Sequence, residues 1–511
     1  MNRLSLVAAT VIVAALCHRP ASAQSLTVDT TGAGLLIDQA LNHSQVMENL
    51  QYLTDVVGPR LTGSPAARQA NEWTLRRFRD YGLDAHLEQW NFGGTWARGP
   101  MWARMTAPRV HDVVAVSWAW APGTNGKTLQ GPVIRIDASA PESLAAYHDR
   151  VKQAWVMLRP PTPVWNTDGP PMTAADSQRQ QEFFRNFFRP PNADSGVRAR
   201  LQQFSNDLPF LLRHAGALGI VLDAGKEQDL LNMSGSPNRV LPLPQVAVAH
   251  EDYALFDRLL RSGAPLRLEL NIRNVMTTDS VPQWNTVGEM RGTEHPGEVV
   301  IVGAHLDSWD LGTGATDNGT GAMCTLEAAR ILAQSGLRPR RTVRFILFTG
   351  EEQGLIGSRK YAAAHAAEAD SIQAVIVLDN GTGAVTGQAL QGRKDLEGLW
   401  RAILAPLAGL HADSVVDRNK GGTDHLSFLP YGVPAFNFNQ LERGYNHTHH
   451  SQSDTYDKAI APDLMQASAV MAVSAYELAN LPGMIPRGEK TTPTPVQAVK
   501  VSDSLVVRRT R

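Results

Sequence analysis

The sequence has few cysteines, no excess of charge of either sign, and an amino-terminal apolar run too short to span a membrane. Only two of its 511 residues are cysteines, so disulfides cannot be the main support of the fold. Its 48 basic residues are matched by 49 acidic ones, which disfavours a nucleic-acid-binding function because no bulk positive charge faces phosphate groups. The apolar run covers residues 4–16, whereas a membrane-spanning helix needs roughly 20 residues.

The remaining composition is that of a folded globular protein. Hydrophobic residues make up 43% of the chain and charged residues 19%, which excludes a disordered or fibrous chain. A chain of 511 residues exceeds what one compact core usually holds. We therefore predict two domains with additional terminal segments.

The amino terminus is typical of an export signal. Arg3 precedes the apolar run, and Ala21-Ser22-Ala23 supply a small-x-small cleavage site before Gln24. We predict a signal peptide at residues 1–23 and a mature protein that is exported, either periplasmic or secreted. After cleavage we expect no membrane association and a single remaining cysteine, Cys324.

The pattern along the mature chain predicts a catalytic domain interrupted by an insert. Short β-rich runs and a polar Pro-rich interval predict a separate β-rich domain at residues 111–275. The catalytic domain then comprises residues 24–110 and 276–482. Residues 483–511 are polar and lack a core-forming period, so they are predicted to be a tail.

Strands and helices alternate in the second part of the catalytic domain. We expect strands at residues 298–304, 342–348 and 374–378, separated by helices at residues 321–332 and 357–367. Alternation of this kind implies crossover connections, and it predicts an α/β fold: a mostly parallel mixed sheet with helices on both faces. Ligand sites in such sheets lie at the carboxyl ends of the strands.

Acidic and imidazole side chains follow these strands in order. His305 and Asp307 follow the first strand, and Asp317 opens the next helix. Glu351 and Glu352 follow the second strand, and Asp379 follows the third. A polar loop from residue 446 to 455 adds three histidines, His447, His449 and His450.

Each of these residues alone has an ordinary structural explanation. A single Asp at a strand end is usually a turn former or a helix cap, and a Glu pair usually faces solvent. Together, however, they supply imidazole nitrogens and carboxylate oxygens at one edge of one sheet. That donor set suits two divalent ions and predicts a metal site.

At these positions the sequence resembles the M28 family of zinc exopeptidases, and in particular its branch of carboxypeptidase Q-like, plasma glutamate carboxypeptidase-type proteins. The resembling segments lie along nearly the whole mature chain, and they are Gly58-Pro59-Arg60-Leu61-Thr62-Gly63-Ser64, His305-Leu306-Asp307-Ser308-Trp309-Asp310, Asp317-Asn318-Gly319-Thr320-Gly321, Leu337-Arg338-Pro339-Arg340-Arg341-Thr342, Glu351-Glu352-Gln353-Gly354, Gly422-Thr423-Asp424, Gly432-Val433-Pro434 and His449-His450-Ser451. The fold expected from this resemblance is the zinc exopeptidase fold. The insert has phrases similar to a protease-associated domain, as relatives often carry at this position.

The resemblance also implies a role for each site residue. Asp317 would bridge two Zn²⁺ ions. His305 and Asp379 would complete the shell of one ion, and Glu352 and His450 that of the other. His450 is preferred to its neighbours because it stands four residues before Asp454, as the ligand does in the family.

The remaining two roles concern proton transfer and orientation. Glu351 would be the general base that takes a proton from a water bridging the two ions and passes it to the leaving amine. Asp307 is expected to accept a hydrogen bond from the far nitrogen of His305 and so fix its tautomer. Mn²⁺ or Co²⁺ would also suit such an oxygen-rich site.

The expected activity is hydrolysis of the amino-terminal peptide bond of short peptides or dipeptides. An M20-type dizinc amidase or deacylase shares the ligand order but carries its extra domain between the fourth and fifth ligands, and here only 71 residues separate Asp379 from His450. A catalytically inactive binding or receptor homologue is the other alternative, and all the expected ligands and Glu351 are present against it. A glutaminyl cyclase-like transferase would share the fold.

Three residues and the oligomeric state stay open at this point. Asp424 and His425 could contact substrate or support the metal ligands, and Asp424 could equally be a turn or cap residue. Tyr445 is a candidate for oxyanion stabilisation. The branch that the sequence resembles includes homodimers.

Overall fold

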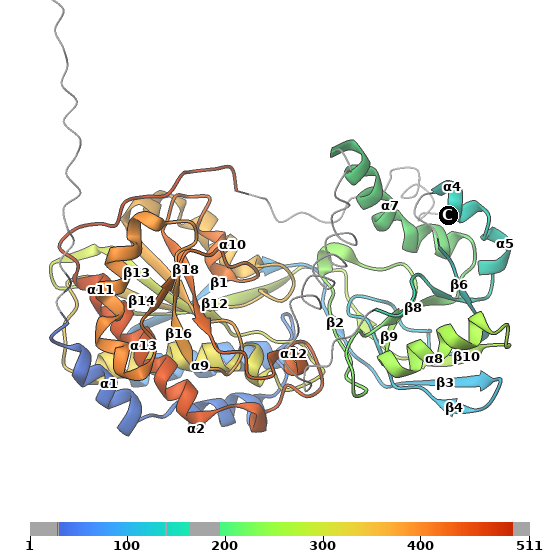
Figure 1. Ribbon diagram of the computed structural model, residues 1–511, viewed down its shortest axis with the longest axis horizontal. Helices are drawn as coiled ribbons and strands as arrows, with labels where there is room; N and C mark the ends of the chain where they lie inside the picture. The colour runs from blue at the N-terminus through green and yellow to red at the C-terminus, as the bar shows by residue number, and fades with distance from the viewer. Residues whose placement is uncertain (1–27, 29, 138–140, 163–194, 494–511) are drawn as a thin grey trace, which may run out of the picture.

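A computed structural model describes residues 28, 30–137, 141–162 and 195–493. These residues form two lobes that lie side by side (Figure 1). The predicted signal peptide, residues 1–23, lies outside the described residues. Within the described part of the chain, no helix combines the length and apolar character needed to cross a membrane.

The larger lobe is built on an eight-stranded mixed sheet. From one edge to the other, its strands are β1 (Asp84–Phe92), β12 (Val281–Met290), β14 (Arg341–Phe348), β13 (His295–His305), β15 (Ile372–Val377), β18 (Ala435–Gln440), β16 (Val385–Ala389) and β17 (Ser414–Val416). The central strands β14, β13, β15 and β18 run parallel to one another, whereas β1, β12 and β16 add antiparallel pairs. Parallel neighbours bring their carboxyl ends to the same edge, which is where ligand sites form in such sheets.

Helices cover both faces of this sheet. On one face, Val300, Val302 and Ala304 of β13 pack in a core with α9 (Thr320–Gln334) and α13 (Ala461–Asn480). On the other face, the alternate residues Val299 and Ile301 pack near α10 (Ile356–Ala364) and the 3₁₀ turn η7 (Asp424–Ser427). Burial on both faces explains why these strands read as continuous apolar runs. The predicted mixed α/β fold is confirmed.

Further helices complete the larger lobe at its amino-terminal and carboxyl-terminal sides. They are α1 (Ala33–Asn42), α2 (Val46–Gln51), the π-helical turn η1 (Tyr52–Val57), α3 (Pro65–Asp80) and α11 (Glu397–Leu404). The Gly/Pro loop of residues 58–64 separates η1 from α3, and the hydroxyl of Ser64 caps α3 by accepting from the amide of Ala67 at 3.1 Å.

The smaller lobe has a second eight-stranded sheet. Its strand order is β4 (His111–Asp112), β3 (Met101–Ala107), β10 (Arg267–Ile272), β6 (Leu129–Arg135), β7 (Trp155–Met157), β8 (Gly219–Asp223), β9 (Gln245–Val248) and β5 (Ala115–Ser117). Two long helices, α7 (Ser195–His214) and α8 (His250–Arg261), accompany this sheet, so the lobe is less purely β than predicted. The short helices α4 (Pro141–Ala145) and α5 (His148–Val151) precede β7.

The insert begins earlier than the predicted residue 111. β3 starts at Met101 and pairs with β10 over its whole length, so it belongs to the second sheet. The short ladder between β2 (Trp96–Ala97) and β11 (Val275–Met276) marks where the chain leaves the larger lobe and returns. The strand pairing is non-local, which is why the local pattern of residues 101–110 did not reveal it.

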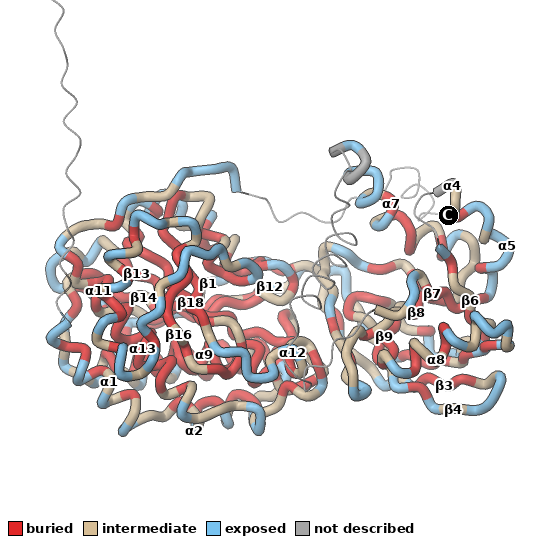
Figure 2. The backbone as a smooth tube through the Cα atoms, viewed as in Figure 1, coloured by how far each residue is buried: buried red, intermediate tan, exposed pale blue. Residues whose placement is uncertain are grey.

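An apolar cluster joins the two lobes. It contains Trp90 and Phe92 of β1, Trp309 of the larger lobe, and Trp120 and Met233 of the smaller lobe, all buried. Figure 2 shows that buried backbone continues through the strands of both lobes. The cluster therefore fixes the insert against the larger lobe by apolar contact.

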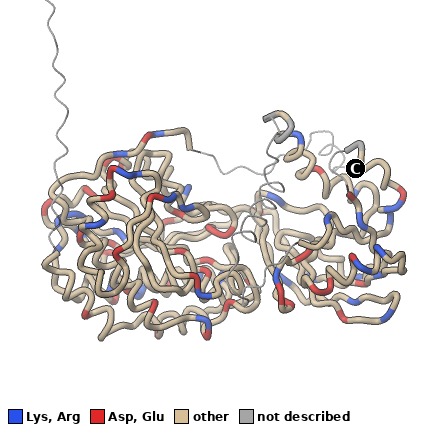
Figure 3. The backbone as a smooth tube through the Cα atoms, in the orientation of Figure 1, with Lys and Arg blue, Asp and Glu red and all other residues tan. Residues whose placement is uncertain are grey.

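An ion pair adds to this junction. Arg98, just after β2, donates to both carboxylate oxygens of Asp310 at 2.7 and 2.9 Å, and also to the carbonyl oxygen of Ser117 in β5. Elsewhere the charges of the two signs are interspersed over both lobes (Figure 3).

The predicted tail begins later than residue 483. Ile485 is only 1% exposed, and its amide donates to the buried side chain of Gln373 at 2.8 Å. Further along, the amide of Gly488 donates to the carbonyl oxygen of Gly432. Lys490 pairs with Tyr431 in an isolated antiparallel β-bridge. Residues 483–493 thus belong to the larger lobe, and residues 494–511 lie outside the described residues.

Candidate metal centre

Three strands, one turn and one loop bring the predicted ligands to one edge of the larger sheet. His305 is the last residue of β13, and Asp317 lies in the turn η3 (Ala315–Gly319) that precedes α9. Glu351 and Glu352 follow β14, and Asp379 follows β15. Their convergence follows directly from the parallel order of β14, β13 and β15.

The first group of ligand atoms surrounds His305. Its Nε2 lies 3.5 Å from Oδ1 of Asp317 and 3.5 Å from Oδ1 of Asp379. His305 is 1% exposed, and the three ligand atoms lie within 4.8 Å of one another. This group corresponds to the first predicted ion.

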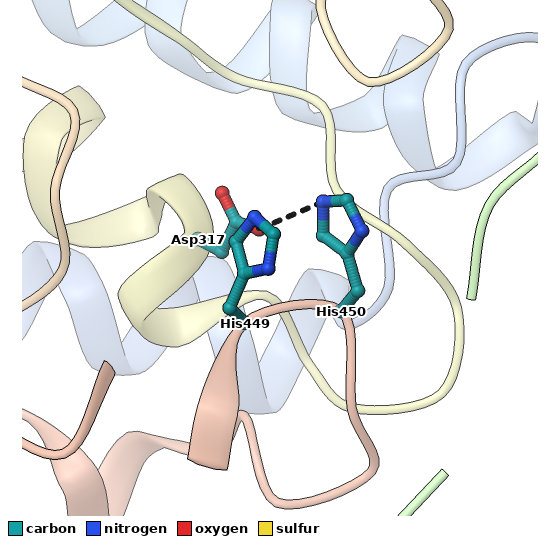
Figure 4. A group of neighbouring side chains, drawn as sticks. All are labelled: Asp317, His449 and His450. Carbon is teal, nitrogen blue, oxygen red and sulfur yellow. Dashed lines mark ion pairs between the residues drawn. The ribbon is translucent and has the colours of Figure 1, made fainter. Parts of the chain in front are cut away.

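The second group surrounds His450, which follows α12 (Tyr445–Thr448). Its Nε2 lies 3.0 Å from Oε2 of Glu352 and 3.4 Å from Oδ2 of Asp317, the contact drawn in Figure 4. Asp317 therefore directs one carboxylate oxygen at His305 and the other at His450. Both predicted groups of ligands meet at this one carboxylate.

His449 is the nearest competitor for the second group. Its ring stacks on that of His450 with the centroids 3.8 Å apart, and its Nε2 is 3.9 Å from Oδ2 of Asp317 (Figure 4). The His449 side chain is 44% exposed, against 21% for His450, and only His450 among the described histidines is within ion-pair distance of Glu352. The geometry therefore favours His450 as the ligand and leaves His449 at the mouth of the site.

The buried acids of the site lack the partners that such groups usually have. Among the described residues, neither Oδ2 of Asp317 nor Oε1 of Glu352 has a hydrogen-bond donor. Burial, reinforced by Asp317, raises the pKa of Glu352 well above its ordinary value. Unpaired buried carboxylates are costly, and divalent cations would compensate their charge. The residues present therefore fit a pair of metal ions.

Glu351 lies next to this ligand set and is held there through Asp307. The carboxylate of Glu351 is 3.9 Å from Nε2 of His305, and its main-chain amide donates to Oδ1 of Asp307 at 3.3 Å. The other oxygen of Asp307 accepts from the hydroxyl of Thr62 at 2.8 Å, and that hydroxyl accepts from the amide of Gly350 at 3.0 Å. Burial is the largest cause that raises the pKa of Glu351 well above its ordinary value.

The hydrogen bond between His305 and Asp307 differs from the expected one in its acceptor atom. Nδ1 of His305 is 3.0 Å from the main-chain carbonyl oxygen of Asp307 and 3.7 Å from its carboxylate. The carbonyl therefore accepts the Nδ1 proton, which directs Nε2 toward the site. The Asp307 carboxylate instead accepts hydrogen bonds from the hydroxyl of Thr62 and the amide of Glu351. The alternation of side chains along the strand does not predict these partners.

Three residues that the sequence did not mark as functional hold the ligands in place. Asp454 accepts from the amides of Thr316 and Asp317 at 2.6 and 3.1 Å. The side chain of Asn318 donates to the carbonyl of Leu378 at 2.9 Å, directly before Asp379. Arg60 is fully buried and donates to main-chain carbonyls on both sides of the site. Arg60 belongs to the segment of residues 58–64 that resembles the M28 family, and this resemblance is the sequence signal that points to it.

Asp424 and His425 are both fully buried in η7. None of their carboxylate oxygens or ring nitrogens has a hydrogen-bond partner among the described residues, so Asp424 is not a helix cap. Burial raises the pKa of Asp424 to about 7 and lowers that of His425 to about 4. Tyr445 packs edge-on against His449 with the ring centroids 5.1 Å apart, beside the second group.

Comparison of the sequence with known proteins points to one family. The sequence profile of Peptidase family M28 matches residues 285–475, which contain all five predicted ligands and Glu351. Carboxypeptidase Q of Mus musculus is 31% identical over 443 residues, covering 86% of this chain and 87% of the relative. Carboxypeptidase Q of Homo sapiens is 28% identical, with 86% of each chain covered.

Solved structures with the same fold agree with this result. A peptidase M28 precursor from Shewanella amazonensis has a TM-score of 0.72 at 22% identity, covering 92% of this chain and 99% of that one. A zinc aminopeptidase from Bacillus subtilis has a TM-score of 0.58 at 18% identity, covering 85% and 94% of the two chains. At these identities the likeness concerns the fold.

Proposed function

Because the chain belongs to peptidase family M28 and is thus a hydrolase of the metallopeptidase class, we propose that it is an exported dizinc exopeptidase of short peptides. The observation that carries the dizinc assignment is the Asp317 carboxylate, whose two oxygens lie 3.5 and 3.4 Å from the imidazoles of His305 and His450. A single carboxylate placed between two nitrogen donors is the arrangement that a bridging ligand requires.

Five side chains would hold the two ions. His305 and Asp379 would bind one ion, Glu352 and His450 the other, and Asp317 both. Imidazole and carboxylate donors favour Zn²⁺, with Mn²⁺ or Co²⁺ as substitutes. When bound, the ions would supply a Lewis acid for the scissile carbonyl and lower the pKa of the attacking water.

Glu351 is the group placed to move the proton. Its carboxylate lies 3.9 Å from His305, next to the ligand set, and none of the five assigned ligand positions uses it. We assign it the role of general base, which takes a proton from the attacking water and returns it to the leaving amine. Asp307 and Thr62 would be positioning residues for Glu351, since they hold its main chain.

The peptide bond that is hydrolysed can be named from the amino end or from the carboxyl end of the substrate. The relatives carry the names carboxypeptidase Q and zinc aminopeptidase, which refer to opposite ends of a peptide. In a dipeptide one peptide bond is both the first and the last. We propose hydrolysis of the amino-terminal bond of dipeptides and short peptides, a substrate range within which the two names agree.

Export and the character of the insert also belong to this proposal. The signal-like residues 1–23 support a periplasmic or secreted enzyme. The inserted lobe would be a protease-associated-like domain docked beside the site through its apolar cluster.

The proposal is tested with the purified mature protein reconstituted with Zn²⁺. Release of free amino acid is followed from leucyl-alanine, from its amino-acetylated form and from its carboxyl-amidated form, with and without a chelator. We expect cleavage of leucyl-alanine that the chelator abolishes, no cleavage of the acetylated form, and two zinc ions per chain by elemental analysis.

Two results would contradict this function. Cleavage that persists after the metal has been removed would exclude a metallopeptidase mechanism at this site. Absence of cleavage from every form, with two ions bound, would favour an inactive binding homologue.

A further inference from the structure

A loop of the inserted lobe reaches the mouth of the metal centre. It follows β8 and begins at Ala224, and Asp223 at the end of β8 holds its start by accepting from the amide of Gly225 at 2.8 Å. Asp223 is itself fixed by His250 of α8, whose Nδ1 lies 3.1 Å from its Oδ2. The loop therefore starts from a rigid point of the insert.

The same loop is bonded along the segment that carries His450. The amide of Met233 donates to the main-chain carbonyl of His450 at 3.1 Å. Gln452 accepts from the amide of Leu231 at 2.8 Å and donates to the carbonyl of Asp229 at 2.9 Å. These contacts place the insert directly against the second group of ligands.

Lys226 is the cation that this loop presents. Its Nζ donates to the main-chain carbonyl of Asn446, at the start of the ligand loop, and the residue is partly buried. An ammonium group has three donors, and this contact uses one. Among the described residues, no carboxylate lies within ion-pair distance of Nζ. Two N–H donors of a partly desolvated cation therefore remain for a ligand.

Carboxylates gather at the His305 end of the site, where the negative charge of Asp379 lies close to Glu351 and Asp424. Lys420 also lies near Asp379. At the His450 end, the ammonium group of Lys226 donates to the carbonyl of Asn446, four residues before His450. A peptide with a free amine and a free carboxylate carries the complementary pair of charges.

We propose that Lys226 binds the α-carboxylate of the substrate, so that the inserted lobe makes the enzyme selective for dipeptides with a free carboxyl end. This inference rests on the proposed exopeptidase function. It goes further because it assigns a substrate-binding residue outside the sheet edge and the family-profile match, in the insert. Lys226 is a specificity-determining residue and takes no part in proton transfer.

The position of Lys226 also sets an upper length for good substrates. Each added residue moves a carboxylate by about 3.3–3.6 Å along an extended chain. The main chain of the loop is held by β8 and by the His450 segment, so a longer substrate would require the Lys226 side chain to give up its contact with Asn446. A dipeptide should therefore be a better substrate than a tripeptide of the same amino-terminal residues.

The test compares matched peptides on matched variants of the full-length mature enzyme. The values of kcat/KM are measured for leucyl-alanine, leucyl-alanine amide and leucyl-alanyl-alanine. A charge-assisted contact predicts that the wild-type enzyme prefers leucyl-alanine to its amide by about ten- to a hundredfold. In Lys226→Met this preference should fall close to one, through a higher KM for leucyl-alanine with little change for the amide.

Two further variants control this experiment. Lys226→Arg keeps the charge and should retain most of the preference. Lys127→Met removes an exposed lysine of the same lobe, in the turn before β6, and should leave all three kcat/KM values unchanged. Zinc content and melting temperature are measured for every variant, so that loss of metal or fold is recognised.

Several outcomes would overturn the assignment. They include equal kcat/KM for leucyl-alanine and its amide in the wild-type enzyme, a result that does not depend on any variant folding. An equal loss on both substrates in Lys226→Met would also overturn it. So would a preference that disappears instead in Lys420→Met, which removes a partly buried lysine near Asp379. Chelator-sensitive hydrolysis of the amide would persist in these cases and leave the proposed function intact. Only a wild-type enzyme that cleaves none of the peptides would refute that function itself.

Discussion

Asp307 illustrates how a residue beside a metal centre acts through its neighbours. Its carboxylate does not accept the His305 proton. It accepts from the hydroxyl of Thr62 at 2.8 Å and from the amide of Glu351 at 3.3 Å. The position of Glu351 is therefore set by a chain of hydrogen bonds that begins at Thr62, in the loop before α3.

Glu351→Gln separates proton transfer from metal binding. The amide fills the same space but cannot accept a proton, so kcat should fall by about 10²- to 10⁴-fold. Two zinc ions per chain should remain, as measured by elemental analysis. Asp317→Asn is the contrasting variant, because loss of the shared ligand should reduce the zinc content. Near-normal turnover in Glu351→Gln would refute the role of this residue.

Thr62→Val tests the positioning of Glu351. The change removes the hydroxyl but keeps the shape, leaving the Gly350 amide and one oxygen of Asp307 without their partner. We expect kcat to fall by about ten- to a hundredfold with zinc content unchanged. Thr74→Val is the control, since the Thr74 hydroxyl bonds to Ala70 within α3 and to Thr286, away from the site. Equal effects of the two variants on kcat would exclude a positioning role.

At the scale of elements, the loops around the site depend on one buried cation. Arg60 donates to the carbonyl oxygens of Gly58, Leu306, Thr313 and Gly314, at 3.0, 2.7, 2.7 and 2.7 Å. It thereby ties the end of β13 to the turn that carries Asp317. Burial lowers the pKa of Arg60 to about 10, with Asp454 and Asp307 acting in the opposite direction, so the side chain stays charged at neutral pH.

Arg60→Met should destabilise both the fold and the metal centre. Four buried carbonyl oxygens lose their donor, and the expected loss is more than about 3 kcal/mol in the free energy of unfolding. Chemical denaturation of the zinc-loaded protein measures it. Arg76→Met, an exposed position on α3, is the matched control and should change stability by less than about 0.5 kcal/mol. A loss below 1 kcal/mol in Arg60→Met would show that water replaces the guanidinium.

A second prediction at this scale concerns the contact between α10 and β1. His365, just after α10, is 3.0 Å from Glu88 of β1 and 3.2 Å from Glu368, and its ring stacks on Tyr361. The hydrogen bond to Glu88 is the largest cause that raises the pKa of His365 above its ordinary value. The folded state therefore binds this proton more tightly than the unfolded state, so its stabilisation is complete below about pH 6.5.

His365→Gln should consequently lose stability at low pH only. The stabilisation by protonated His365 disappears as the pH rises through its raised pKa, so wild-type and variant proteins should converge at pH 9. Because the pair is partly exposed, we expect a difference of about 0.5 kcal/mol at pH 6. Denaturant unfolding at both pH values measures it, with His86→Gln at an exposed site as control. A difference that is larger at pH 9 would have the wrong sign.

At the scale of the whole molecule, the residues that follow α13 pack back onto the larger lobe. Beyond α13, Ile485 is buried and Arg487 donates to the carbonyl oxygens of Ile372 and Ala369. Thr491 donates to Pro430 at 2.8 Å. These contacts tie residues 483–493 to the start of β15 and to the loop before β18, on the larger lobe.

Truncation distinguishes this segment from the residues that follow it. Removal of residues 494–511 should leave the melting temperature unchanged, as their polar sequence predicts. Removal of residues 482–511 exposes the site of Ile485 and removes two hydrogen-bond partners of the buried Gln373, Gly483 and Ile485, at a cost of about 2 kcal/mol or more. Differential scanning calorimetry compares the two. Equal melting temperatures would show that the contacts of residues 483–493 contribute nothing to stability.

Much of the larger lobe could be predicted from the sequence because its strands are buried on both faces. Residues 298–304, 342–348 and 374–378 read as apolar runs and lie within or largely within β13, β14 and β15. The sequence predicts the start of the insert about ten residues too late, because the alternating side-chain pattern of residues 101–107 would fit a strand in the sheet of either lobe. The carboxyl-terminal segment packs through isolated contacts that leave no periodic pattern.

The sequence by itself determined the α/β fold and the order in which acidic and imidazole residues follow its strands. These depend on local periodicity and on residue types that follow strands, which are properties of short segments. Only the tertiary structure decided that Asp317 faces two imidazoles, that Asp307 holds Glu351, and that Lys226 of the insert lies beside the His450 loop. Each of these depends on distances between residues far apart in the chain, and such distances are fixed by the non-local packing of sheets and lobes.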